Sequence, residues 1–165
     1  MDAVAFRSHP QRLCLSSDVD MKERLDKFGA FFVQNLRDKI LDYLETLLAG
    51  KSKALEVQEL QRKLAQLSEE EKKLVRDLVE DITTDGMHDL LFALQEEADA
   101  GGAIRVLVDD KEVAKASGGL HGELFGDEGW IVRYSKYPSE KERQRSRWAR
   151  EQIQRMFRER GEDQG

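Results

Sequence analysis

The chain has 165 residues, of which 39% are hydrophobic and 36% charged, and its formal net charge is −6. This length predicts one domain, and no apolar run approaches the ~18 residues of a membrane-spanning helix. The single cysteine excludes an intramolecular disulfide and any metal site built on several thiolates. The negative net charge weighs against a free-standing nucleic-acid-binding domain. We therefore expect a cytoplasmic protein with one hydrophobic core and long solvated helix faces.

The N-terminal residues 1–17 are predicted to form a loosely held tail. They include Arg7 and Arg12 but lack the continuous apolar stretch of a secretory signal. Met21 is an alternative start to Met1, and the sequence leaves that choice open.

The rest of the chain is predicted to be a single α+β domain: a bundle of about four helices, a three-stranded antiparallel β-meander and a C-terminal helix. The predicted ranges are 18–160 for the domain, 18–100 for its helical part, 103–135 for the meander and 138–160 for the last helix.

A long first helix is predicted over 18–49, because apolar residues recur there every three or four positions. Gly50 follows at the position where a C-terminal capping glycine belongs. The apolar stripe is wider than one neighbouring helix requires, so it predicts a homo-oligomer that forms through this helix. The stripe consists of Leu25, Phe28, Phe32, Leu36, Ile40, Tyr43 and Leu47.

Three further helices are predicted before the glycine pair 101–102. The second covers 53–66, and the third opens on a capping box formed by Ser68 and Glu71. The segment 83–86, Thr-Thr-Asp-Gly, predicts a break before a fourth helix over 87–99. The residues predicted to face inward are Leu55, Leu60, Leu64 and Leu67 in the second helix, and Leu74, Val75, Leu78, Val79 and Ile82 in the third.

After the glycine pair the pattern changes to short β-type segments. Residues 104–108, 112–116 and 130–134 predict three strands. A meander of three strands needs a helical layer beneath it, which the preceding helices would provide.

The predicted C-terminal helix 138–160 is strongly basic. It holds eight Lys and Arg against four Glu, a net charge of +4, which leaves −10 for the rest of the chain. Docking on the acidic body, or a mobile tail, is the favoured interpretation. The alternative is nucleic-acid binding through phosphate contacts, which would be carried by Arg143, Arg145, Arg147 and Arg150.

The segment 118–130 is the candidate site, because five of the twelve glycines lie in it and sites concentrate on loops. Its His121-Gly122-Glu123 has the H-x-E spacing of zinc deaminases, but their P-C-x-x-C element is missing because Cys14 is the only cysteine. No P-loop or dinucleotide fingerprint is present. We predict no metal or cofactor; the alternative, on ligand type, is a metal site formed by His121, Glu123 and Asp127, with or without His88. The residues predicted to bind a small ligand are His121, Glu123, Asp127, Trp130 and His88; glycines that simply permit tight turns are the plain alternative.

The stretch from Asp85-Gly86-Met87-His88-Asp89-Leu90-Leu91 to Gly129-Trp130 resembles a family of small uncharacterised bacterial proteins. The resemblance implies a bacterial cytoplasmic protein and carries no activity or site residue.

These observations favour a non-enzymatic protein-interaction or regulatory module. The first alternative is a small-ligand-binding protein or enzyme that uses the loop 118–130. The second is a nucleic-acid-binding protein that uses the basic C-terminal helix.

Overall fold

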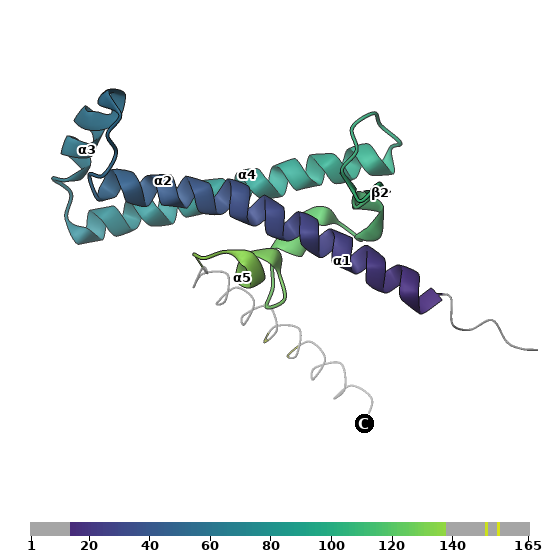
Figure 1. Ribbon diagram of the computed structural model, residues 1–165. Helices are drawn as coiled ribbons and strands as arrows, with labels where there is room; N and C mark the ends of the chain where they lie inside the picture. Colours follow the sequence, from purple (N-terminus) through teal and green to yellow (C-terminus); the bar gives the residue numbers. More distant parts are fainter. Residues whose placement is uncertain (1–13, 138–150, 152–154, 156–165) are drawn as a thin grey trace, which may run out of the picture.

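Two long helical rods lie side by side and dominate the computed structural model, which describes residues 14–137, 151 and 155, without the side chains of 14–18 (Figure 1). The first rod consists of α1 (Cys14–Phe32), the π-helical turn η1 (Val33–Arg37) and α2 (Asp38–Leu48). The second is α4 (Glu69–Asp99). The short helices η2 (Leu55–Val57) and α3 (Gln58–Leu64) connect them. The remaining elements are β1 (Leu107–Val108), β2 (Lys111–Glu112), η3 (Ala114–Ala116), η4 (Leu120–Leu124) and α5 (Trp130–Tyr134).

The first rod buries one residue in every four along its centre: Leu25, Gly29, Val33, Arg37 and Leu41. In a regular α-helix a spacing of four drifts by about 40° per step, so such a stripe would wind away from its neighbour. The π-helical turn, in which the Asp38 amide donates to the Val33 carbonyl, is wider and removes part of this drift. The stripe therefore stays on the side that faces the rest of the molecule. The rod begins at Cys14, ahead of the predicted residue 18.

Trp130 packs directly on the backbone of α1 at Gly29. A Cβ atom at Gly29 would overlap the indole ring, and Phe28 meets that ring edge-on with 5.8 Å between centroids. Trp130 is 1% exposed. Glycine at this position therefore lets α5 approach α1.

Alanine substitutions at two helical glycines should have opposite effects. Gly29→Ala is expected to lower the free energy of unfolding by about 1–3 kcal/mol, because the new methyl group has no room. Gly86→Ala, within α4 and with open space around it, should raise it by about 0.5–1 kcal/mol through helix propensity. Denaturant unfolding of both variants measures this. Equal effects at the two sites would contradict the close packing of Trp130 on α1.

The second rod confirms the predicted capping box and corrects the predicted break. The Ser68 hydroxyl accepts from the Glu71 amide, and the Glu71 carboxylate accepts from the Ser68 amide. The helix then continues through 83–86, because Thr83 and Thr84 are buried and extend the inward face towards the core residue Met87. Burial against the first rod outweighs the local turn signal.

The predicted inward faces of the second and third helices were wrong at five positions. Leu55 is 87% exposed and Leu60 45%. In α3 the buried side chain is Gln61, whose amide group accepts a hydrogen bond from the Ser52 backbone amide and donates one to the Ser52 carbonyl. On α4 the exposed residues are Leu74, Leu78 and Ile82, at 68%, 55% and 63%.

The three-stranded meander was also wrong. β1 and β2 form one short antiparallel hairpin whose turn places Asp109 and Asp110 at positive φ. Residues 130–134 are the helix α5, in which the Arg133 amide donates to the Gly129 carbonyl. Short apolar runs fit either periodicity, and here burial of the adjacent pair Trp130 and Ile131 selects the helix.

At the coarser level the mainly helical chain with a small antiparallel sheet agrees with the predicted α+β class. Of the predicted helix 138–160 the structure describes only Glu151 and Arg155, both helical. The four arginines predicted for nucleic-acid binding lie outside the described residues. Within the part of the chain that is described, no helix has both the length and the apolar character needed to cross a membrane.

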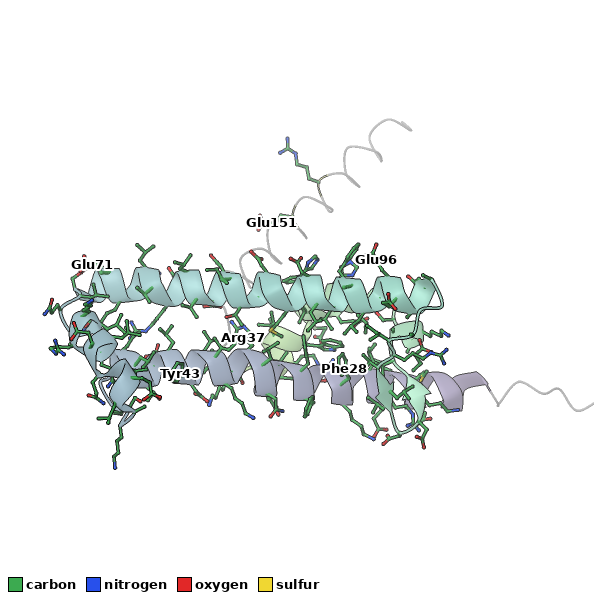
Figure 2. All side chains as sticks on the ribbon, turned by 90° about the horizontal axis from the view of Figure 1, so that it is seen from above. Phe28, Arg37, Tyr43, Glu71, Glu96 and Glu151 are labelled. Carbon is green, nitrogen blue, oxygen red and sulfur yellow. The ribbon has the colours of Figure 1, made fainter. Side chains whose placement is uncertain are left out.

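Arg37 joins the two rods to the segment after α5 and is 0% exposed (Figure 2). Its Nη2 donates to Glu80 Oε1 of α4 at 2.6 Å. Its Nη1 donates to Ser135 Oγ at 2.6 Å and to the Tyr137 carbonyl at 2.8 Å. Asp38, next in sequence, accepts from Ser135 Oγ. This network fixes the point from which the chain continues beyond Tyr137.

Tyr137 is held by a second bond of this region, from its hydroxyl to Asp42 Oδ1 at 2.6 Å. The Asp42 carboxylate, with some burial, raises the pKa of Tyr137 to about 12, above the ~10 of an unfolded chain. The folded state therefore keeps the phenol proton to a higher pH than the unfolded state, so the stabilisation is complete below pH ~10 and is lost as the pH rises towards 12.

We expect the free energy of unfolding to fall more steeply between pH ~10 and ~12 in the wild type than in Tyr137→Phe, which lacks this proton. Denaturant titrations across that range measure the difference. Tyr43→Phe is the matched control, because Tyr43 is 52% exposed. If Tyr137→Phe kept the full alkaline slope, the bond to Asp42 would contribute nothing.

Candidate functional site

The glycine-rich segment 118–130 is packed against the rods by buried apolar residues. Leu120 and Leu124 of η4 are 0% exposed. The backbone amide of Leu120 donates to Gln95 Oε1 of α4 at 3.1 Å, and Gln95 is itself buried. Ser117 fixes the start of the segment, because its hydroxyl accepts a hydrogen bond from the Gly119 amide and donates one to the Glu123 carboxylate. The segment is therefore a fixed scaffold with two sides.

One side brings together the two predicted histidines. The imidazoles of His88 on α4 and His121 on η4 meet edge to face, with 5.1 Å between centroids. The ring centroids of Phe92 and His121 are 5.1 Å apart, and those of Phe125 and His88 are 6.0 Å apart. His88 Nδ1 is 3.2 Å from Asp89 Oδ1, whereas the buried Nδ1 of His121 has no hydrogen-bond partner among the described residues.

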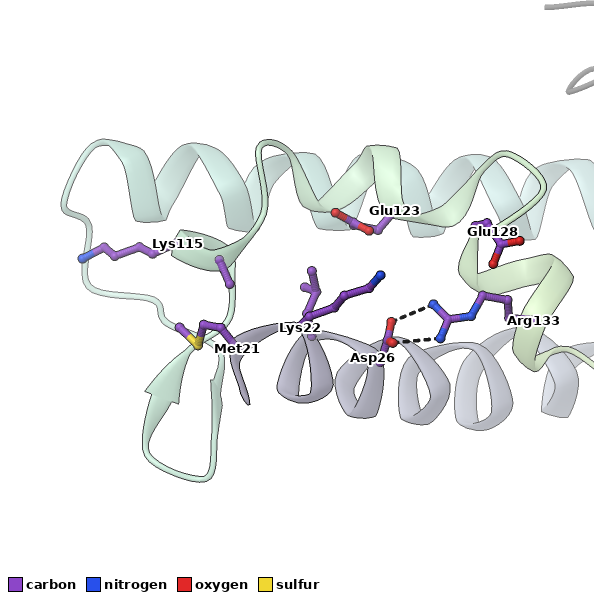
Figure 3. A pocket seen from close by; sticks show the side chains of 9 residues that line it. Met21, Lys22, Asp26, Lys115, Glu123, Glu128 and Arg133 are labelled. Carbon is purple, nitrogen blue, oxygen red and sulfur yellow. Dashed lines mark hydrogen bonds and ion pairs between the residues drawn. The ribbon is translucent and has the colours of Figure 1, made fainter. Parts of the chain in front are cut away.

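Glu123 lies on the other side, away from His121. η4 is a 3₁₀ helix, in which each residue turns by about 120°, so residues two apart point in different directions. The Glu123 carboxylate accordingly accepts a hydrogen bond from the Ser117 hydroxyl. It also lines a cavity against α1 (Figure 3). The H-x-E spacing therefore does not place the two side chains around one point.

The other predicted residues are separated as well. Trp130 belongs to the core against Gly29, and Asp127 is exposed on the loop before α5. Among the described residues, no group of three or more His, Cys, Asp and Glu side chains could hold a metal ion.

The cavity against α1 has a volume of about 720 Å³ and is lined by both acidic and basic side chains. In its lining, Arg133 of α5 donates two hydrogen bonds of 2.8 Å to Asp26 of α1. The hydrogen bond from Arg133 lowers the pKa of Asp26, and the charge of Lys22 adds a smaller effect. The sequence analysis did not predict this cavity, because its wall combines residues that are about 100 positions apart.

A second surface that the sequence did not predict runs along the outside of α4. With about 100° of rotation per residue, positions spaced by three or four residues share one face. Eight such residues are all exposed and fall within an arc of about 80°. We term them the outer line: Glu71, Leu74, Leu78, Ile82, Asp85, Asp89, Phe92 and Glu96.

Comparison with known proteins does not name a family for this chain. No family model matches the sequence, and neither the curated proteins nor the solved structures contain a significant match. Function therefore has to be argued from the chain's own surfaces.

The unpartnered His121 nitrogen makes a specific substitution informative. His121→Phe keeps the ring contacts with His88 and Phe92 and removes a buried polar atom, so the free energy of unfolding should rise by about 1 kcal/mol. His88→Phe is the control, because His88 Nδ1 already lies beside Asp89, and its change should stay within about 0.5 kcal/mol. Thermal and denaturant unfolding measure both. A clear loss of stability in His121→Phe would mean that this nitrogen has a partner on which the fold depends.

Proposed function

We propose that this protein is an interaction module whose contact surface is the outer line of α4. The observation that carries the proposal is the exposure of Leu74, Leu78 and Ile82, at 68%, 55% and 63%. They are spaced by four residues on the side of α4 away from its buried residues. A row of large exposed aliphatic side chains is the usual mark of a contact surface.

The charge on the outer line defines the partner. Its polar members are Glu71, Asp85, Asp89 and Glu96, and none of the eight residues is basic. A second copy of α4 would set these acids against one another, which is unfavourable. A basic amphipathic helix would place apolar residues on the leucines and cations beside the acids.

Residues 138–160 of a second copy fit this description and are the occupant that we propose. They carry a net charge of +4, and their large apolar residues are Trp148, Ile153, Met156 and Phe157. Within one molecule, Arg37 holds Tyr137 beside Glu80, which lies on the inward side of α4. A helix starting after Tyr137 would have to pass around α4 to reach the outer line of its own chain, whereas a second copy can approach it directly.

The predicted homo-oligomer is thus retained with a different contact. Most of the stripe predicted on 18–49 packs within the chain, because Leu25 and Leu47 are buried and three further members, Phe28, Phe32 and Leu36, lie partly buried against the core. Ile40 and Tyr43 are the exposed members, at 37% and 52%. The outer line of α4 offers more exposed aliphatic surface.

Analytical ultracentrifugation of the full chain tests this proposal. The wild type should self-associate, and the association should weaken as salt rises, because charge pairs at the contact are screened. Leu78→Lys should lower the association constant about tenfold or more, since it places a cation on the apolar centre. Replacing Arg143, Arg145, Arg147 and Arg150 together by Gln should also weaken it.

Leu55→Lys is the matched control and should associate like the wild type, because Leu55 is 87% exposed on η2 and is not a member of the outer line. A wild type that stays monomeric at high concentration and low salt would refute the self-association. An oligomer that is insensitive to Leu78→Lys would place the contact elsewhere.

A further inference from the structure

The cavity between α1 and the segment 114–133 is the strongest further candidate, and it lies apart from the outer line of α4. Its volume of about 720 Å³ falls within the roughly 300–1,000 Å³ of small-molecule sites. Its apolar wall is formed by Met21, Leu25 and Ala116. Such a cavity can exclude water from part of a ligand while charged groups at its edge set the orientation.

The charged lining is balanced. The lining contains Lys22, Lys115 and Arg133 together with Asp26, Glu123 and Glu128. The Lys115 side chain extends away from the other five (Figure 3). Three cations and three anions favour neither a net cation nor a net anion as ligand. Selection must therefore depend on where individual charges remain available.

Most of these charges already have partners. Arg133 binds Asp26 through two bonds, Lys115 pairs with Glu112 at 3.2 Å, and Glu123 accepts from Ser117. Lys22 on α1 and Glu128 before α5 are different. Both are exposed, and neither forms a direct hydrogen bond or salt bridge with another described residue; Lys22 acts only through its charge on Asp26, and Glu128 only through its charge on Arg133. Two opposite charges thus line one cavity without pairing with each other.

We propose that this cavity binds a small zwitterion of the amino-acid or short-peptide type. The carboxylate of the ligand would meet the Lys22 ammonium, and its ammonium group would meet Glu128 and the remaining acceptor capacity of Glu123. A ligand with one charge would satisfy only one of the two groups. A zwitterion satisfies both, and its apolar part can contact Met21 and Leu25.

Binding is tested by calorimetric titration of the full chain with free L-amino acids and with dipeptides, which separates the two sources of this chemistry. Saturable binding by members of either set is expected. For the best ligand, the alkyl amine and the carboxylic acid that each keep one of its charges should bind at least about tenfold more weakly, because each loses a charge-assisted contact.

Two variants locate the binding. Lys22→Gln and Glu128→Gln should each raise the dissociation constant about tenfold. The controls are Lys39→Gln and Glu56→Gln, two exposed charges on α2 and η2, which should bind like the wild type. Circular dichroism confirms that all four remain folded. The proposal is overturned by absence of saturable binding at millimolar ligand, by equal binding of the singly charged analogues, or by unchanged binding in both site variants. Self-association is measured separately, so either proposal can fail alone.

Discussion

The arrangement of this molecule depends on a guanidinium group buried where three parts of the chain meet. Moving a charge out of water costs several kcal/mol unless partners replace the lost hydration. Arg37 obtains those partners from Glu80 on the second rod and from Ser135 and the Tyr137 carbonyl after α5. Each contact satisfies part of the same buried group, so the positions of these segments are interdependent. Removal of one partner would leave the buried Arg37 guanidinium incompletely compensated, which would destabilise the whole network.

A second buried polar group, the Gln95 side chain, also needs a hydrogen-bond partner, and this need positions the glycine-rich segment with two chemically different sides. Gln95, buried on α4, fixes the start of η4 through the Leu120 amide. The tight 3₁₀ turn then sends His121 towards the aromatic residues of α4 and Glu123 towards α1. Residues that are close in sequence therefore lie on separate surfaces, and the H-x-E spacing does not bring the two side chains to one point.

Local chemistry was sufficient to predict some features of the fold. The capping box at Ser68 needs nothing beyond its own side chains, and Gly50 ends α2 at φ +65° through backbone freedom alone. Features that depend on distant neighbours were not predictable in this way. Thr83 lies in a turn-like segment, yet burial against the first rod keeps it helical. The cavity was missed for the same reason, because Lys22 and Glu128 come to line one cavity only after α5 has packed on α1.

The exposed aliphatic line on α4 follows from the small number of layers in this fold. Periodicity predicts that a helix has an apolar face, but the number of neighbours decides how much of it is covered. Here α4 packs on the first rod and on the segment that contains η4 through its inward side, and His121 of η4 also reaches Phe92 at the edge of the outer line. The described part of the chain places no third layer over Leu74, Leu78 and Ile82, which remain exposed. Because the acids beside them add charge without covering the aliphatic surface, a basic amphipathic helix complements both components at once.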